Sequence, residues 1–371
     1  MKFSVPSSEF QRTLARVAGV VPSKSTLPIL ENILVELKKN TLRLVATDLE
    51  ISMSATMEVK GSEDGTITVP AKRLMDTVRS LPEIEVIFTG DLSANRVKMI
   101  TETGEYQLLG EPSTDFPAVP EMKGDGELRI DGAMLKRVIH KTSFAVSTDE
   151  LRPAMTGVLL QIRETDINAV ATDGHRLVCY RVKKEKVAKD SRDVIIPAKA
   201  LNILVRTLED GEYTVAMSNT HIQFRVAHTA LTSRLIEEKY PNYESVIPGD
   251  NNRILNVKRE DLLGVVRRVA LYSSATTHQI RFSAKKNELR LAAEDIDFGG
   301  EAREKIGCSY SDEEMEIGFN SNYVVDLLSH IDSDDVAFKL STPVRAAIIT
   351  PATQKEGEDV LMLVMPVRLN N

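Results

Sequence analysis

The chain alternates between two spacings of hydrophobic residues. Apolar and polar residues alternate along short segments, which is typical of half-buried antiparallel strands, at residues 33–37, 41–45, 85–88, 97–101 and 221–226. The pattern also predicts longer helical segments, at 7–20, 71–81, 131–146, 197–208, 258–272 and 320–331. Pro6, Pro70 and Pro197 stand where three of these helices begin, a position at which the missing N–H costs nothing.

One stretch of the chain recurs at about a third of its length. The segment LRLVATD at 42–48 returns as INAVATD at 167–173 and as LRLAAED at 289–295, with offsets of 125 and 122 residues. Phe116-Pro117 returns as Tyr240-Pro241 and Met365-Pro366, with offsets of 124 and 125. The repeat predicts three related domains, 1–126, 127–250 and 251–371, joined in the Gly/Asp-rich stretches 123–127 and 249–253.

A weaker repeat lies inside each third. A strand that enters a helix recurs after 64, 66 and 62 residues in the three thirds, so the chain consists of six half-units. This organisation predicts an α+β fold in which each domain packs two helices on one side of antiparallel sheet.

Net charge alone argues against a nucleic-acid partner. The 371 residues include 47 basic and 54 acidic ones, a formal charge of −7, and only 5% are aromatic. The six predicted helices nevertheless sum to +8, which leaves −15 on the rest of the chain. Either these cations decorate solvated helix faces, or they form a basic layer on an acidic body.

Several protein classes are disfavoured. Cys179 and Cys308 are single and far apart, so we expect neither a disulfide framework nor a metal site, and a reducing cytoplasm fits. No apolar run reaches the roughly 18 residues of a membrane span, and the N-terminus lacks a signal-peptide pattern. Asp173 and His175 would face one way on a strand, yet no nucleophile motif, phosphate loop or metal-ligand cluster accompanies them. We therefore expect a protein without a cofactor that is not an enzyme, with an Asp173/His175 enzyme as an unfavoured alternative.

Helix dimensions limit what such a two-faced repeat can enclose. Six helices packed about 8–10 Å apart in a circle leave a hole of about 8–9 Å, whereas twelve leave about 25 Å. A DNA duplex about 20 Å across fits only the larger ring. Two chains closing head to tail could therefore surround DNA, and a toroidal scaffold that never encloses DNA is the alternative.

Several motifs resemble the bacterial DNA polymerase III beta subunit family, the sliding clamps. They are MKF at 1–3, TLPIL at 26–30, ATDGHRL at 171–177, MEIGFN at 315–320 and VMPVRL at 364–369. The resemblance runs from end to end and includes the triplication. It implies a clamp fold in a head-to-tail homodimeric ring, with helices lining the hole, that slides on duplex DNA and confers processivity in DNA replication. It also implies a clamp loader, the replicative DNA polymerase alpha subunit and other proteins with a clamp-binding motif as partners.

The resemblance also suggests which residues meet DNA. Family positions beside the hole correspond to Lys24, Arg73, Asp149, Pro153 and Ala154, where Pro153-Ala154 replaces a common aromatic pair. Arg152 is a neighbouring candidate or a plain loop residue. The helix cations complete the predicted DNA surface, namely Lys72, Arg79, Lys136, Arg137, Lys141, Lys199 and Arg206.

Two further surfaces follow from the resemblance. A pocket for partner peptides would use Met155, Thr172, Gly174, His175, Arg176, Leu177, Pro241, Val246, Val344, Ala346, Val364, Met365, Pro366, Val367 and Arg368. Arg176 and His175 would orient the peptide, and Ser245 stands where the family often has Arg. Without the family, a strand that ends in an Asp-Gly turn would be the favoured interpretation of the 172–177 motif. The dimer interface would include Tyr106, Leu108, Leu271 and Tyr272.

Overall fold

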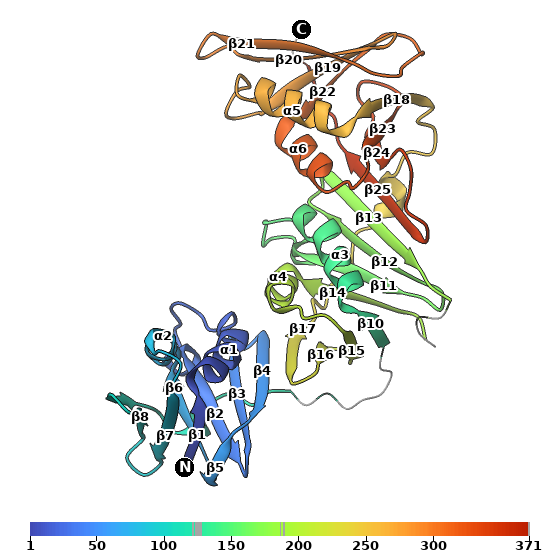
Figure 1. The fold of residues 1–371 in the computed structure, drawn as a ribbon. Coiled ribbons are helices and arrows are strands. Elements are labelled where there is room, and N and C mark those ends of the chain that lie inside the picture. The colour runs from blue at the N-terminus through green and yellow to red at the C-terminus, as the bar shows by residue number, and fades with distance from the viewer. Residues whose placement is uncertain (121, 123–127, 186, 188–189, 370–371) are drawn as a thin grey trace. The chain divides into compact units, whose positions relative to one another are not determined.

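The structure is a computed structural model that describes residues 1–120, 122, 128–185, 187 and 190–369. The chain separates into two compact units, one of residues 1–135 and 199–235 and the other of residues 136–198 and 236–371 (Figure 1). The predicted join at 123–127, and with it the boundary at 126, lies outside the described residues. The other predicted join falls in the loop that ends where strand β18 begins at Arg253.

The described residues include six α-helices, each starting directly after a strand, as the half-repeat predicts. They are α1 (Ser7–Ala18), α2 (Ala71–Ser80), α3 (Gly132–Thr142), α4 (Ala198–Thr207), α5 (Arg259–Ala270) and α6 (Ser321–Ser329). The predicted ranges overshoot the ends by a few residues, most at α3. There the Thr142 hydroxyl donates to the Val138 carbonyl at 2.7 Å, and the chain continues as a short 3-10 helix, η3 (Ser143–Ala145).

The first unit contains two antiparallel sheets. A five-stranded sheet has the order β5 (Lys60–Glu63), β1 (Lys2–Pro6), β7 (Glu85–Asp91), β8 (Arg96–Ile100) and β9 (Glu105–Leu109). An eight-stranded sheet has the order β10 (Leu128–Asp131), β15 (Glu212–Met217), β16 (His221–Val226), β17 (Thr229–Arg234), β4 (Ile51–Glu58), β3 (Thr41–Thr47), β2 (Asn32–Lys38) and β6 (Gly65–Pro70). Helices α1 and α2 lie side by side here, and α1 packs on β3 and β4 (Figure 1).

The second unit repeats this plan. Its eight-stranded sheet has the order β14 (Arg192–Pro197), β11 (Gly157–Ile162), β12 (Asp166–Thr172), β13 (Arg176–Lys183), β25 (Glu358–Val364), β24 (Ala347–Pro351), β23 (Asp335–Leu340) and β18 (Arg253–Lys258). Its four-stranded sheet has the order β21 (Gly300–Gly307), β20 (Glu288–Asp295), β19 (Gln279–Lys285) and β22 (Met315–Asn320). Helices α5 and α6 contact each other, as α1 and α2 do.

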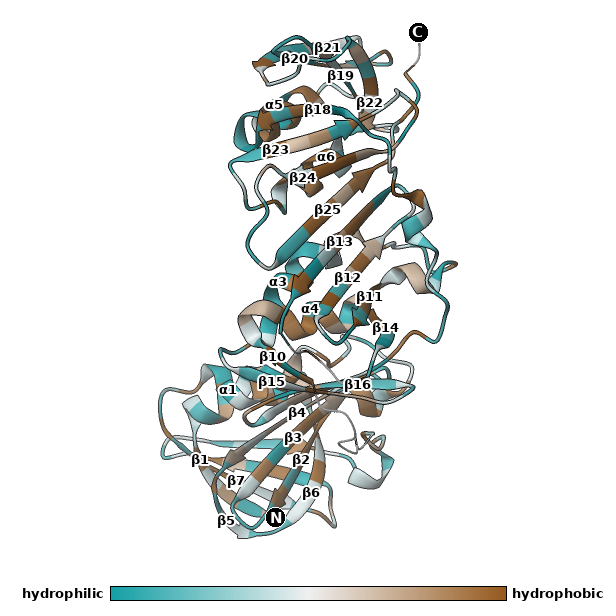
Figure 2. Cartoon of the chain, turned by 90° about the vertical axis from the view of Figure 1, so that its right-hand side faces the viewer, coloured by the Kyte–Doolittle hydropathy of each residue, from teal (hydrophilic) through white to brown (hydrophobic). Residues whose placement is uncertain are grey.

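Each large sheet joins strands from two of the predicted thirds. In the first unit β17 pairs with β4, from Thr229 opposite Ala55 to Ser233 opposite Ile51. In the second unit β13 pairs with β25 over seven residue pairs, and Figure 2 shows these strands side by side. The repeat is therefore held together by continuous backbone hydrogen bonding as well as by side-chain packing.

The cores use the alternation that predicted the strands. In β1, Phe3 and Val5 are buried, and the ring of Phe3 stacks on that of Phe88 with centroids 4.7 Å apart while Phe10 of α1 meets it edge-on at 6.1 Å. Phe282 and Phe319 form an equivalent edge-on pair at 5.3 Å in the second unit. The α+β prediction of paired helices on antiparallel sheet is confirmed.

Candidate functional site

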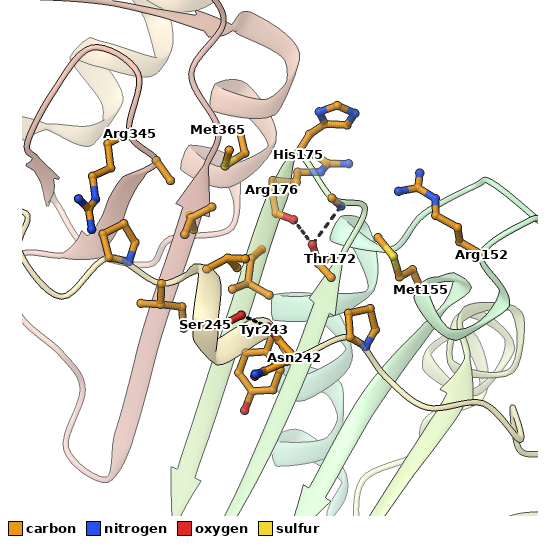
Figure 3. A pocket seen from close by; sticks show the side chains of 18 of the residues that line it. Arg152, Met155, Thr172, His175, Arg176, Asn242, Tyr243, Ser245, Arg345 and Met365 are labelled. Carbon is orange, nitrogen blue, oxygen red and sulfur yellow. Dashed lines mark hydrogen bonds between the residues drawn. The ribbon is translucent and has the colours of Figure 1, made fainter.

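The second unit contains a largely apolar pocket of about 500 Å³. Figure 3 shows it between Arg152 on one side and Arg345 on the other. Five segments supply its walls: the β12–β13 turn, the 3-10 helices η4 (Pro153–Thr156) and η5 (Tyr243–Val246), the loop before β24, and the end of β25 with Met365. Cavities of this size and polarity are typical of sites for small apolar ligands and peptide side chains.

The β12–β13 turn forms because its side chains bond the backbone. Asp173 Oδ1 accepts the N–H groups of His175 and Arg176, both at 2.9 Å, and Thr172 Oγ1 accepts that of Gly174 at 3.1 Å. Gly174 has a φ of 90°, which favours glycine. The motif at 172–177 is thus an Asp-Gly turn and also part of the pocket wall, so the two interpretations of the sequence are compatible.

The pocket floor rests on the core of the unit. Leu177, Leu363 and Ala346 are buried in one apolar cluster with Tyr243. The Tyr243 hydroxyl donates to Gln161 Oε1 at 2.7 Å, which fixes the η5 wall to strand β11. Val344 and Val246 at the rim are 75% and 53% exposed. A rigid apolar floor with an exposed apolar rim suits a ligand that buries hydrophobic groups.

The structure brings together most, but not all, of the residues predicted for this pocket. Those that line it are Met155, Thr172, Gly174, His175, Arg176, Leu177, Pro241, Val246, Val344, Ala346 and Met365. Pro366, Val367 and Arg368 are outside the lining because the chain turns away after Met365, where Val367 N–H donates to Gly318 O at 2.9 Å. Val364 is outside it too, because this last residue of β25 is fully buried and alternation directs it away from the face of Leu363 and Met365.

Sequence reasoning did not assign the other lining residues to the pocket. They are Arg152, Asn242, Tyr243, Ile247, Pro248, Arg345 and Leu363, whereas Ser245, noted as the replacement of a family arginine, also lines it. Leu363 could have been found by alternation, since it lies two residues before Met365 on the same side of a strand. Arg345 belongs to a loop, and no pattern in the sequence marks that loop.

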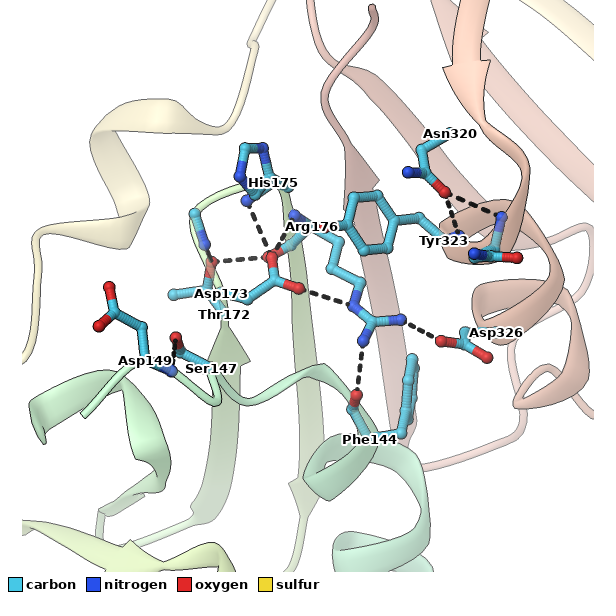
Figure 4. Close-up of polar contacts among 12 residues, drawn as sticks. Phe144, Ser147, Asp149, Thr172, Asp173, His175, Arg176, Asn320, Tyr323 and Asp326 are labelled. Atoms are coloured by element: carbon cyan, nitrogen blue, oxygen red, sulfur yellow. Dashed lines mark hydrogen bonds and ion pairs between the residues drawn. The ribbon is translucent and has the colours of Figure 1, made fainter. Parts of the chain in front are cut away.

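The guanidinium of Arg176 is already occupied within the chain. Its side chain is 10% exposed, and it contacts Asp173 Oδ2 at 3.0 Å, Asp326 Oδ2 at 2.5 Å and the Phe144 carbonyl at 2.9 Å (Figure 4). The rings of Phe144 and Tyr323 lie 5.5 and 4.9 Å from it. Arg176 thus lines the pocket while its guanidinium is bound within the chain, and its role in orienting a peptide stays a prediction. His175 is exposed and its ring stacks on Tyr323 at 5.9 Å, so it remains available at the rim.

Asp173 and His175 do not form an acid–base pair. Asp173 accepts the backbone N–H of His175, and its second oxygen pairs with Arg176. Among the described residues, no group of three or more His, Cys, Asp or Glu side chains could hold a metal ion, and no helix is long and apolar enough to cross a membrane. Cys179 is half-buried against the apolar cluster, and desolvation raises the pKa of its thiol to about 12.

The basic helices form the second candidate surface. With their observed bounds, the six α-helices carry 13 basic and 5 acidic residues, a net charge of +8. Six of the predicted DNA-contacting cations are exposed and have no acidic partner among the described residues, namely Lys24, Lys72, Arg73, Arg79, Lys136 and Arg206.

Other predicted cations have partners. Lys199 pairs with Asp48, Arg137 Nε lies 3.2 Å from Glu358, and Arg152 pairs with Asp149 at 2.9 Å. Hydrogen bonds from the Leu151 N–H and from Arg152 lower the pKa of Asp149, so this carboxylate neutralises Arg152. Pro153 is exposed, and Ala154 packs against the apolar cluster beneath the pocket.

Lys141 departs from the prediction. Its side chain is only 4% exposed, and its ammonium donates to the His330 carbonyl at 2.5 Å and pairs with Asp332 at 2.6 Å. The charge therefore joins the end of α3 to the turn after α6, and it does not face solvent as a phosphate contact would.

The residues predicted for self-association lie on one edge strand, β9, and directly after helix α5. Strand β9 is one edge of the five-stranded sheet, and β21 is one edge of the four-stranded sheet. Tyr106 on β9 is half-buried, and Leu108 is buried in its own unit while its neighbour Leu109 is 69% exposed. Leu271 and Tyr272, after α5, are 82% and 47% exposed. Phe298, in the β20–β21 turn and absent from the prediction, is 87% exposed.

Comparison with known proteins covers the whole chain. Residues 1–120, 129–242 and 244–368 match the profiles of the DNA polymerase III beta subunit N-terminal, central and C-terminal domains. The beta sliding clamps of Pseudomonas aeruginosa and Chlamydia muridarum are each 32% identical to it, with all of both chains aligned. The crystal structure of the sliding clamp from Bartonella birtlesii bound to griselimycin superposes with a TM-score of 0.94 over all of both chains, at 32% identity.

Proposed function

Because the chain belongs to the DNA polymerase III beta subunit family and acts as a DNA sliding clamp, we propose that two copies close head to tail around duplex DNA. The observation that carries this proposal is the division of charge, with +8 on the helices and −15 on everything else. A lining of twelve helices would leave a hole of about 25 Å, wide enough for the duplex.

The exposed helix cations would hold DNA without reading its sequence. Lys and Arg side chains on rigid helices attract phosphates, and the attraction weakens with salt because counterions are released. Lys72, Arg73 and Arg79 of α2 are exposed and have no acidic partner in the part of the chain that the structure describes, and the same holds for Lys136 of α3 and Arg206 of α4. Loose phosphate contacts suit a ring that must slide, since topology keeps it on the DNA.

The two open strand edges would form the ring interface. An exposed edge strand presents unpaired backbone groups and readily adds a strand from another chain. Apolar side chains beside β9 and β21 would then be buried between copies, chiefly Tyr106, Leu109, Leu271 and Tyr272. Substituting Leu271→Asp should convert the dimer to monomer in sedimentation, whereas Leu92→Asp, an exposed leucine in another turn, should leave it dimeric.

The pocket would tether partner proteins. An apolar peptide from the replicative polymerase alpha subunit, the clamp loader or another clamp-binding protein would place its hydrophobic side chains on the floor around Leu177. The chain itself would carry out no chemistry and would work in the cytoplasm, where DNA is replicated. We also propose that griselimycin, the ligand in the Bartonella birtlesii clamp structure, binds this pocket.

Retention on circular DNA tests the ring. The protein, loaded onto nicked circular DNA, should stay through a salt wash and leave when the circle is linearised. Equal retention on circular and linear DNA would contradict enclosure. Failure to load on any DNA, despite a dimeric state, would favour a scaffold that never encloses it.

Substitution at the rim tests the pocket. Val344→Asp places a charge on an exposed lining residue, so it should abolish griselimycin binding in calorimetry and reduce polymerase processivity without unfolding the protein. Leu151→Asp is the matched control, because Leu151 is 91% exposed and does not line the pocket. Equal effects of the two substitutions would contradict the assignment.

A further inference from the structure

Helix α6 differs from the other five helices in its charge. Asp326 is its only charged residue, so among the α-helices of the described residues α6 alone has a negative net charge. An acidic residue weakens a lining that attracts phosphates, so its presence calls for another role. The contacts of Asp326 within the second unit provide one.

Asp326 is the counter-ion of Arg176. Asp326 Oδ2 lies 2.5 Å from Arg176 Nη1 and 46% of the Asp326 side chain is exposed, whereas only 10% of the arginine side chain is. Arg176 opens strand β13, and side chains alternate across a sheet. Leu177 therefore faces the pocket floor, while the guanidinium of Arg176 points to the helices on the other side (Figure 4).

One guanidinium thus joins three segments of the chain. Its Nε donates to Asp173 in the β12–β13 turn, its Nη1 to Asp326 on α6 and its Nη2 to the Phe144 carbonyl in η3. The flat cation also lies against the Tyr323 and Phe144 rings, which restricts its rotation. An arginine held by five groups acts as a fixed joint more than as a mobile surface charge.

The same joint determines where the pocket wall stands. Asp173 uses one oxygen for Arg176 and the other for the backbone N–H groups of His175 and Arg176. His175 in turn accepts the Met365 N–H at its carbonyl at 2.8 Å, and its ring lies on Tyr323 of α6. The turn and Met365, which both line the pocket, are therefore tied to α6 through contacts that include Arg176 and Asp326.

We infer that Asp326 is a positioning residue for the pocket and that α6 and the pocket are energetically coupled through Arg176. The inference rests on the proposed function, because it concerns the binding of a ligand in the pocket. Removing the charge of Asp326 leaves the guanidinium with one carboxylate and lets it shift toward Asp173, which rearranges the turn. Coupling between sites is reciprocal, so a ligand in the pocket should also stabilise α6.

The test uses three variants and griselimycin as the probe. Asp326→Asn removes the charge and keeps the shape, and Asp326→Glu keeps the charge. Asp332→Asn removes a carboxylate from the same region that pairs with Lys141 and makes no contact with Arg176. We expect Asp326→Asn to weaken griselimycin binding about 5- to 10-fold, the lower end of common coupling strengths, while Asp332→Asn and Asp326→Glu stay within about twofold of wild type.

Hydrogen exchange separates positioning from loss of stability. In the wild type, griselimycin should slow amide exchange in α6, and this protection should be lost in Asp326→Asn and retained in Asp332→Asn. Absence of binding to the wild type would overturn the pocket assignment and this inference with it. Wild-type binding that is unchanged in Asp326→Asn, or equally weakened in Asp332→Asn, would overturn the inference alone.

Discussion

The reassignment of Lys141 from a DNA contact to a buried joint can be tested by neutralising it. Lys141→Met keeps a long unbranched side chain in the same space, so packing is largely preserved while the charge is lost. The ammonium currently donates to the His330 carbonyl at 2.5 Å and to Asp332 at 2.6 Å, and the side chain is 4% exposed. Lys136→Met on the same helix is the matched control, because Lys136 is exposed.

The expected loss of stability follows from these contacts. A hydrogen bond to a charged group contributes about 1.5–3 kcal/mol, and the pair with Asp332, which is 75% exposed, adds little because solvent screens it. We therefore expect Lys141→Met to lower the free energy of unfolding by about 2 kcal/mol. In a unit of about 200 residues this corresponds to a fall in Tm of about 4–8 °C.

Two measurements on both variants distinguish the roles. Calorimetry should give a lower Tm for Lys141→Met and an unchanged Tm for Lys136→Met. Binding to a short duplex, followed by anisotropy over a series of salt concentrations, should show a log–log slope reduced for Lys136→Met by about 0.9 per lysine lost, or about 1.8 for the two copies of the ring, and unchanged for Lys141→Met. The opposite pattern, with Lys141→Met thermally normal and its salt slope reduced, would refute the reasoning.

Three further predictions concern other parts of the molecule. Desolvation on burial lowers the pKa of His330, so the unfolded chain binds the proton more readily than the folded one. Stability should therefore fall as the pH drops below the ordinary histidine pKa of 6.5. His330→Gln should flatten the dependence of Tm on pH between about 5 and 8. Maleimide at mildly alkaline pH should label Cys308 before Cys179, because burial raises the pKa of Cys179 to about 12, and mass spectrometry of peptides will identify the modified site. A Cβ at Gly318 would lie 2.7 Å from the Val367 carbonyl, so Gly318→Ala should displace the segment after Met365 and weaken griselimycin binding, which calorimetry measures.

Much of the fold could be predicted from the sequence because the signals were local and repeated. Alternation of apolar and polar residues predicts strands directly. One sequence pattern occurs three times, 125 and 122 residues apart, so a chance resemblance between the segments is not a reasonable explanation. The pairing of β17 with β4 and of β13 with β25 could not be predicted in this way. The alternation within a strand predicts which of its faces is buried, but it does not predict which other strand pairs with it.

The site residues were predicted less evenly, for a physical reason. Leu177 and Met155 are apolar residues whose place in the pocket agrees with their chemistry. Charged residues can serve a surface or a buried pair, and the sequence does not reveal which, because the partner lies far along the chain. Lys141 meets His330 and Asp332, and Arg176 meets Asp326, 150 residues away. Only the fold brings these partners together.

The repeat allows the turn in the pocket wall to be compared with its counterpart in the first third of the chain. Asp48 accepts the N–H groups of Glu50 and Ile51 as Asp173 does those of His175 and Arg176, so the two turns share one backbone design. Leu49, with a φ of 80°, takes the place of Gly174, with a φ of 90°. A leucine in this left-handed conformation strains the backbone of the first turn, whereas the glycine in the second turn adopts it without strain.

The absent side chain at Gly174 has a direct consequence for the pocket. A Cβ there would lie 3.1 Å from Arg152 Nη1 and 3.6 Å from Met155 Cε, two residues of the neighbouring wall. A side chain the size of leucine would therefore occupy the space that a ligand needs. Two turns with the same hydrogen bonds thus differ in the volume of one side chain, and under the proposed function this difference, more than backbone architecture, leaves room for a ligand at the second turn.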